Sequence, residues 1–190
     1  MKALLKTKYS SIKMFTLLAM VLLLCGKSVA QSSKSIPSSI DGFVQSQEEK
    51  KAILEKREQW RKTFEAKSVE DIMKYYAPDI LSYDLMAPIQ FEGEAMWRNN
   101  WVNFFNTFND IVLTFEDLTV FQSGDLATIR GLTRLQCSTA NGSKIDMWSR
   151  ETNVMRKING EWLIVHDHVS VPMDFATGRA LTDLKPIEQK

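Results

Sequence analysis

The chain has 190 residues, of which 44% are hydrophobic and 25% are charged, and its formal net charge is +1. This length and composition fit one globular domain with its own core. The balanced charge, without a basic run, argues against nucleic acid as a partner. The only cysteine beyond the N-terminal segment is Cys137, so no disulfide is expected within the domain.

The first 30 residues have the layout of a secretory signal peptide. Lysines precede an apolar run from Met14 to Cys25, and small residues around Ala30 suit a cleavage point. The apolar run is short for a bilayer-spanning helix, so a retained anchor is the weaker alternative. We expect a secreted or periplasmic protein cleaved after Ala30, with no membrane contact afterwards. Loss of five lysines would change its net charge to −4.

The next segment, residues 31–45, is rich in serine and is expected to be a flexible leader. A capping box at Ser46 then opens a predicted long helix, in which Ile53, Trp60 and Phe64 recur at helical spacing. We therefore place the domain at residues 46–176, followed by a C-terminal tail at 177–190.

Two further helices are predicted. One begins at Ser68, which is paired with Asp71 as a cap, and it stops before Pro78. The other follows a short strand-like piece at 79–84. It carries an aromatic stripe at helical spacing: Trp97, Trp101, Phe104, Phe105 and Phe108.

From Ile111 onward the pattern becomes strand-like, with turn signals at Gly124, Gly142 and Gly160. We predict an antiparallel meander of four long strands at 111–122, 125–138, 143–157 and 161–171. Helices followed by such a sheet predict an α+β fold in which three helices cover one face of a curved, mainly antiparallel sheet. The last strand is apolar on both faces, so we also predict a homodimer formed through the sheet.

A curved sheet under three helices leaves room for a cavity, and the sequence offers polar candidates to line it. Tyr83 and Asp84 are candidates at the end of the short strand-like piece. Asp84 precedes an apolar loop, where desolvation would raise its pKa towards that of a useful base. The alternative is an exposed loop carboxylate or a helix-cap partner. Trp60, Trp97 and Trp101 are candidates for a ligand-binding wall or for plain core packing.

The middle strands carry a second set of candidates. Arg134 and Arg150 are suited to bind an anionic ligand, because a guanidinium presents a planar fork to carboxylates and phosphates. A structural ion pair with Asp146 or Glu151 is the alternative. Asp146, Trp148 and Arg150 alternate along one strand face, which we expect to line the cavity.

Both histidines of the chain, His166 and His168, lie two residues apart on the last predicted strand and would share one face. A metal site would need a third ligand, and no further histidine exists, so neither a metal nor another cofactor is expected. We expect these histidines to point into the cavity, as its polar lining or as acid–base groups.

Four stretches carry a resemblance to a known family: residues 83–101, 130–135, 146–162 and 165–175. Over residues 46–175 the chain resembles the nuclear transport factor 2-like superfamily, and within it the SnoaL-like, ketosteroid isomerase-related branch. The resemblance implies a cone-shaped barrel of helices on a curved sheet. It does not fix a reaction, since this superfamily includes isomerases, dehydratases, cyclases and binding modules.

Aligned with ketosteroid isomerase, Asp84 falls on the catalytic aspartate of that family. Trp60 falls on the oxyanion-hole tyrosine, and the second donor falls near Thr152 or Asn153, so the resemblance keeps the base and not the oxyanion hole.

Two functions follow from this pattern. The first is an isomerase, dehydratase or cyclase-type enzyme that uses Asp84 as base on a small ring-bearing substrate. The second is a non-catalytic module that binds a small apolar or anionic molecule, or that serves assembly.

Overall fold

The computed structural model describes residues 40–187. The expected signal peptide at 1–30 and most of the leader lie outside the described residues, as do the last three residues of the chain.

The first described helix, α2 (Ile40–Glu65), begins earlier than the sequence predicted. Ser46 is therefore not its N-cap, and the Ser46 hydroxyl instead donates a hydrogen bond to Gln122 at 3.3 Å. The face of α2 that packs on the core carries Ile53, Trp60 and Phe64, as predicted, because these positions recur at helical spacing.

Two shorter helical segments complete the layer. Helix α3 (Val69–Ile72) starts at the predicted cap, where the Ser68 side chain accepts a hydrogen bond from the Asp71 amide. It continues into the 3-10 turn η1 (Met73–Tyr75). Helix α4 (Gly93–Thr107) buries Trp97, Trp101 and Phe105. Within residues 40–187 no helix has the length and apolar character needed to cross a membrane.

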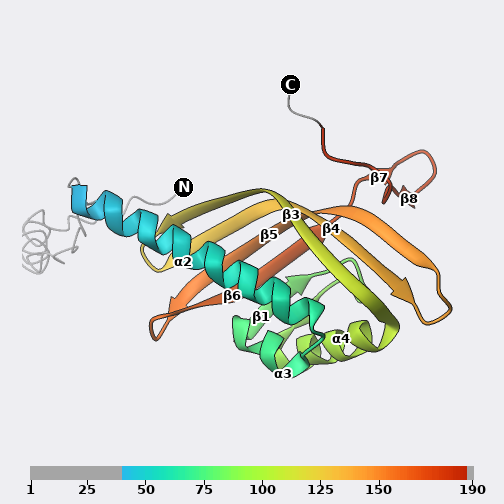
Figure 1. Ribbon diagram of the computed structural model, residues 1–190, viewed down its shortest axis with the longest axis horizontal. Helices are drawn as coiled ribbons and strands as arrows, with labels where there is room; N and C mark the ends of the chain where they lie inside the picture. The colour runs from blue at the N-terminus through green and yellow to red at the C-terminus, as the bar shows by residue number, and fades with distance from the viewer. Residues whose placement is uncertain (1–39, 188–190) are drawn as a thin grey trace, which may run out of the picture. The chain divides into compact units, whose positions relative to one another are not determined.

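Six strands form one sheet with the order β2-β1-β6-β5-β4-β3. Their bounds are β1 Tyr76–Tyr83, β2 Phe91–Glu92, β3 Phe108–Ser123, β4 Leu126–Thr139, β5 Lys144–Ile158 and β6 Glu161–Ser170. The predicted four-strand meander is confirmed, while the parallel pairing of β1 with β6 was not predicted. Figure 1 shows α2 running along the sheet, with α3 and α4 grouped near one end. A separate hairpin follows, made of β7 (Met173–Asp174) and β8 (Arg179–Ala180).

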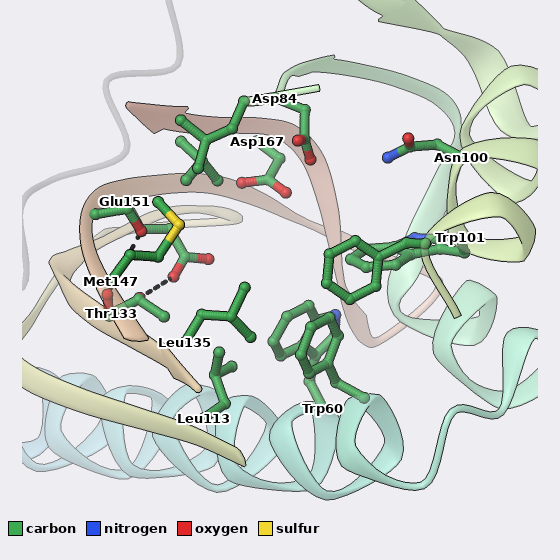
Figure 2. Close-up of a pocket in the computed structure, with 15 residues that line it drawn as sticks. Trp60, Asp84, Asn100, Trp101, Leu113, Thr133, Leu135, Met147, Glu151 and Asp167 are labelled. Carbon is green, nitrogen blue, oxygen red and sulfur yellow. Dashed lines mark hydrogen bonds between the residues drawn. The ribbon is translucent and has the colours of Figure 1, made fainter. Parts of the chain in front are cut away.

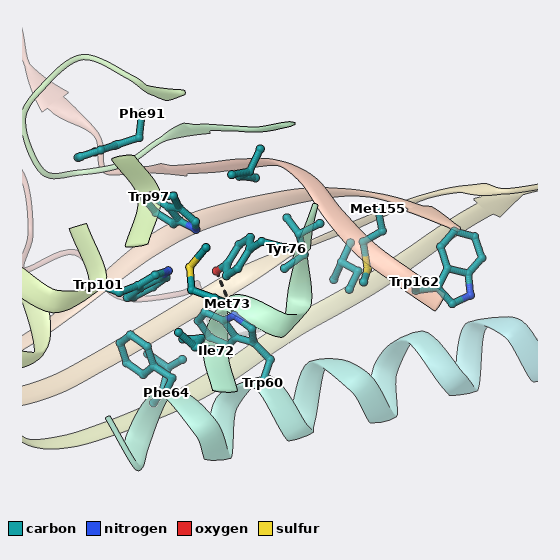
Figure 3. Close-up of a cluster of buried hydrophobic side chains, with 14 of the residues drawn as sticks. Trp60, Phe64, Ile72, Met73, Tyr76, Phe91, Trp97, Trp101, Met155 and Trp162 are labelled. Carbon is teal, nitrogen blue, oxygen red and sulfur yellow. Dashed lines mark hydrogen bonds between the residues drawn. The ribbon is translucent and has the colours of Figure 1, made fainter. Parts of the chain in front are cut away.

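The core between helices and sheet is strongly aromatic (Figure 3). Trp60 stacks on Phe64 with ring centroids 5.2 Å apart, and the Trp97 and Trp101 rings meet edge to face at 5.0 Å. The Trp60 indole N–H donates to the buried Tyr76 hydroxyl at 3.0 Å. This hydrogen bond satisfies two polar atoms that burial would otherwise leave unpaired.

A bulge in β6 decides which of its side chains face the helices. The β5–β6 register pairs Val154 with His166 but Met155 with Ile164, so one extra residue lies at Val165. Such an insertion reverses the alternation of side chains beyond it. Trp162 and Ile164 are therefore buried before the bulge, and Asp167 is buried after it.

A second bulge, in β3, brings the β3 backbone close to Gly131 of β4. An added Cβ at Gly131 would lie 2.7 Å from Leu118 Cδ2 and 2.9 Å from the Glu116 carbonyl oxygen. Gly131→Ala is therefore expected to lower the free energy of unfolding by about 1–3 kcal/mol, because the backbone of β3 must shift to admit the methyl group. Urea denaturation checks this, and an unchanged midpoint would show that the bulge adapts freely.

Candidate active site

A cavity of about 90 Å³ lies between the helices and the inner face of the sheet. Trp60, Phe64, Trp101 and Phe104 form its aromatic wall, and other lining residues are Asp84, Leu85, Asn100, Leu113, Thr133, Leu135, Met147, Ser149, Glu151, Asp167 and Val169. Figure 2 shows that Glu151 on β5, Asp167 on β6 and Asp84, which follows β1, reach this space. Three carboxyl groups thus share one small cavity.

Asp84 directly follows β1, at the edge of the cavity. One of its oxygens accepts a hydrogen bond from the Met86 amide at 2.9 Å. Burial raises the pKa of Asp84 above its ordinary value, the amides of Met86 and Leu85 counteract part of this rise, and the charge of Glu151 adds to it. The structure thus places Asp84 where a base would work, and its catalytic role stays a prediction.

Asp167 is the most enclosed acid of the cavity, with only 4% of its surface exposed. Its Oδ1 accepts a hydrogen bond from the Asn153 amide at 2.7 Å. Burial, together with the charges of Glu151 and Asp84, raises the pKa of Asp167 well above its ordinary value. Asp167 was not among the predicted site residues, because only the bulge in β6 turns it inward.

Glu151 is held by a buried ion pair with Arg57 from α2. Its other oxygen accepts a hydrogen bond from the Thr133 hydroxyl at 2.6 Å. The Arg57 guanidinium lies between two aromatic rings, 4.1 Å from the centroid of Trp60 and 4.3 Å from that of Phe115. Arg57 was also overlooked, although it occupies the apolar stripe of its helix, which is the signal that could have identified it.

The two histidines lie on the other side of the sheet, so the expectation that they point into the cavity is wrong. His168 is exposed, and the His166 Nδ1 donates to the Leu81 carbonyl at 2.8 Å. Both rings pack against Tyr83, with centroids 4.9 and 5.9 Å from it. Tyr83 is itself exposed and does not line the cavity, so the expectation that it does is also wrong. The physical reason is the bulge at Val165, which places Asp167, between the histidines, on the inner face.

The candidates on β4 and β5 also lie on this outer face, the face opposite the helices. Arg134 and Asp146 form an ion pair at 2.7 Å, as in the predicted alternative to anion binding. Trp148 lies under the Arg134 guanidinium, 6.0 Å away, and Arg150 is exposed. Their neighbours in the alternation, Met147, Ser149 and Glu151, line the cavity instead.

The three tryptophan candidates on the helices divide into two groups. Trp60 and Trp101 line the cavity, whereas Trp97 is fully buried in the core beside it. The Trp60 N–H is bonded to Tyr76 and does not serve as an oxyanion donor in this arrangement. Among residues 46–187, no group of three or more histidine, cysteine or acidic side chains is placed to hold a metal ion.

The raised pKa of Asp167 predicts how stability depends on pH. The folded protein keeps this proton to higher pH than the unfolded chain does, so stability should fall as pH rises from the unfolded pKa, about 3.9, towards the folded one. The slope for one group is about 1.4 kcal/mol per pH unit in that window.

Asp167→Asn removes this titrating group, so the variant is expected to lose that slope and to be more stable than the parent at neutral pH. Chemical denaturation at several pH values measures the difference. A variant whose stability follows the same pH curve as the parent would contradict the assignment.

Comparison with known proteins supports the fold. Residues 53–174 match the family model for the SnoaL-like domain. An NTF2-like protein of unknown function from Pseudomonas putida is 30% identical; the match covers 72% of this chain and 95% of that chain, with a TM-score of 0.66.

Two more distant structures share the fold. The association domain of CaMKII from C. elegans is 22% identical, with 66% and 97% of the two chains covered and a TM-score of 0.57. A ketosteroid isomerase-like protein from Erwinia carotovora is 19% identical, with 58% and 86% covered and a TM-score of 0.52. No curated protein matches the sequence significantly. The chain therefore belongs to the SnoaL-like domain family and has the nuclear transport factor 2-like fold.

Proposed function

We propose that the domain binds a small organic molecule in the cavity and transfers protons on it, as an isomerase or a lyase does. Asp84 acts as general base, and Asp167, rather than a histidine, acts as general acid. The observation that carries this proposal is that burial raises the pKa of both carboxyl groups on one cavity. Titratable groups with shifted pKa values in a common cavity are typical of acid–base sites.

The arrangement supports a two-proton step. The Asp84 carboxylate takes a proton from a substrate carbon, and the electron pair of that C–H bond moves towards an acceptor atom. The Asp167 carboxylic acid gives its proton to the acceptor atom. Return of a proton to a different carbon completes an isomerisation, and loss of a protonated hydroxyl group as water completes a dehydration.

The second candidate function is binding or assembly without catalysis. The small cavity favours it, since about 90 Å³ is well below the size of most drug-sized ligand sites, which is about 300–1,000 Å³.

Proton exchange in D₂O separates the two functions. The protein is incubated with a panel of cyclic enones, lactones and imines, and loss of the substrate C–H signals is followed by proton NMR. Exchange above the buffer rate is expected for at least one compound. His168→Ala is the matched control and should exchange at the parent rate, because this side chain is exposed outside the cavity. Binding of panel compounds without any exchange would favour the non-catalytic function.

We also propose that the chain forms a homodimer through the outer face of the sheet. Leu132, Trp148, Val154 and Leu163 are only partly buried on this face in the single chain. Val154→Glu is expected to shift a dimer towards monomer, because it places a charge within the apolar contact. Sedimentation velocity checks both proteins, and a monomeric parent would refute the proposal.

A further inference from the structure

The charge of the cavity is unbalanced. Three carboxyl groups line it. The nearby cation, the Arg57 guanidinium, already forms an ion pair with one of them, Glu151. Asp84 and Asp167 then have no cationic partner among the described residues. The two arginines expected to bind an anion, Arg134 and Arg150, lie on the outer face and leave this imbalance unchanged.

The wall of the cavity also favours positive charge. Aromatic faces carry a negative potential that attracts cations, and Trp60 and Trp101 are part of the wall. The protein already uses this attraction beside the cavity, because the Arg57 guanidinium lies over the Trp60 ring.

Two polar groups of the cavity lack hydrogen-bond partners among the described residues, and a ligand could supply them. Asn100 is only 7% exposed and lines the cavity, and among residues 46–187 its side chain has no hydrogen-bond partner. Figure 2 shows its amide directed towards the two aspartates. The second oxygen of Asp167 also has no donor among these residues. A bare metal ion does not fit this set, because no three acidic groups there are close enough to hold one.

We propose that the ligand of this cavity carries a basic nitrogen, an amine or imine, that is positively charged when bound. The proposal rests on the proposed function and deepens it by naming the substrate class. For an imine, the Asp167 O–H bond breaks and an N–H bond forms, giving an iminium ion paired with the Asp167 carboxylate. Asp84 then takes a proton from the adjacent carbon, the C–H electron pair forms a C=C bond, and the C=N pair returns to nitrogen. The product is an enamine.

This chemistry accounts for the lost oxyanion hole. An enolate would place negative charge beside three carboxyl groups, whereas an iminium ion places positive charge there. The Trp60 N–H donates to the Tyr76 hydroxyl and is not free to act as an oxyanion donor. An iminium ion needs no such donor, because its charge is positive.

Three probes of matched shape test the charge: tert-butylammonium, tert-butanol and pivalate. Isothermal titration calorimetry at pH 7 should show the cation binding about 10- to 100-fold more tightly than the alcohol, with pivalate weakest. Binding should release protons, because the cation favours the ionised forms of Asp84 and Asp167. The affinity should therefore fall as pH is lowered, with Glu151, Arg57 and Tyr76 as the other titratable groups near the site.

Three variants test whether the cation binds in this cavity. Asp84→Asn and Asp167→Asn should each reduce the preference for the cation, whereas Asp146→Asn, at the ion pair on the outer face, should leave it unchanged. Circular dichroism confirms that each variant is folded. Equal affinity for the alcohol, tighter binding of pivalate, or no binding of any probe would overturn the proposal. If the protein prefers the neutral alcohol but still catalyses proton exchange on a panel compound, the proposed function holds and only the proposed ligand class is wrong.

Discussion

Replacing Arg57 by methionine is expected to lower the free energy of unfolding at pH 7 by about 3–5 kcal/mol. Arg57 and Glu151 are 3% and 8% exposed, and the guanidinium is the cation paired with this carboxylate. Methionine fills similar space between Trp60 and Phe115 but leaves Glu151 charged and unpaired. The cost comes from that isolated charge more than from lost packing.

A second variant identifies the cause of this loss. The double variant with Glu151→Gln removes the unpaired charge and should recover much of the loss at pH 7. A loss below about 1 kcal/mol in the single variant would show that water reaches Glu151.

Replacing Asp84 by asparagine is expected to slow proton exchange on a responsive substrate by about 10²- to 10⁴-fold. Asparagine keeps the shape of the side chain but does not accept the proton. Stability should not fall, because the change removes a carboxylate whose pKa burial raises.

Asp79→Asn is the matched control for this variant. Asp79 lies on β1, the strand that Asp84 follows, but it is exposed and pairs with Arg156 on the surface. Its rate of exchange should equal that of the parent, measured by the same NMR assay. Equal slowing in both variants, or none in Asp84→Asn, would remove Asp84 from the role of base.

The architecture could be predicted from the sequence because its signals are local. Ser68 caps its helix as expected, and the turns at Gly124, Gly142 and Gly160 have the positive φ angles that favour glycine. Asp84 could be placed in the cavity because it ends a short strand before an apolar loop.

The side-chain directions could not be predicted, because they depend on tertiary structure. An unbroken alternation in β6 would have continued the inward set from Ile164 to His166 and His168, and the bulge at Val165 replaces that set with Asp167. The same limit applies to β5, where alternation alone does not say which of two faces the helices cover. Trp148 and Arg150 were placed on the inner face, which Glu151 occupies.

A pH titration of Asp84 and Asp167 tests whether they form an acid–base pair in one desolvated cavity. Carboxyl carbon NMR of ¹³C-labelled protein, assigned with the Asp84→Asn and Asp167→Asn variants, reports both groups. Both pKa values are expected to lie above the ordinary aspartate value of about 3.9, with that of Asp167 the higher. Ordinary values for both groups would contradict it.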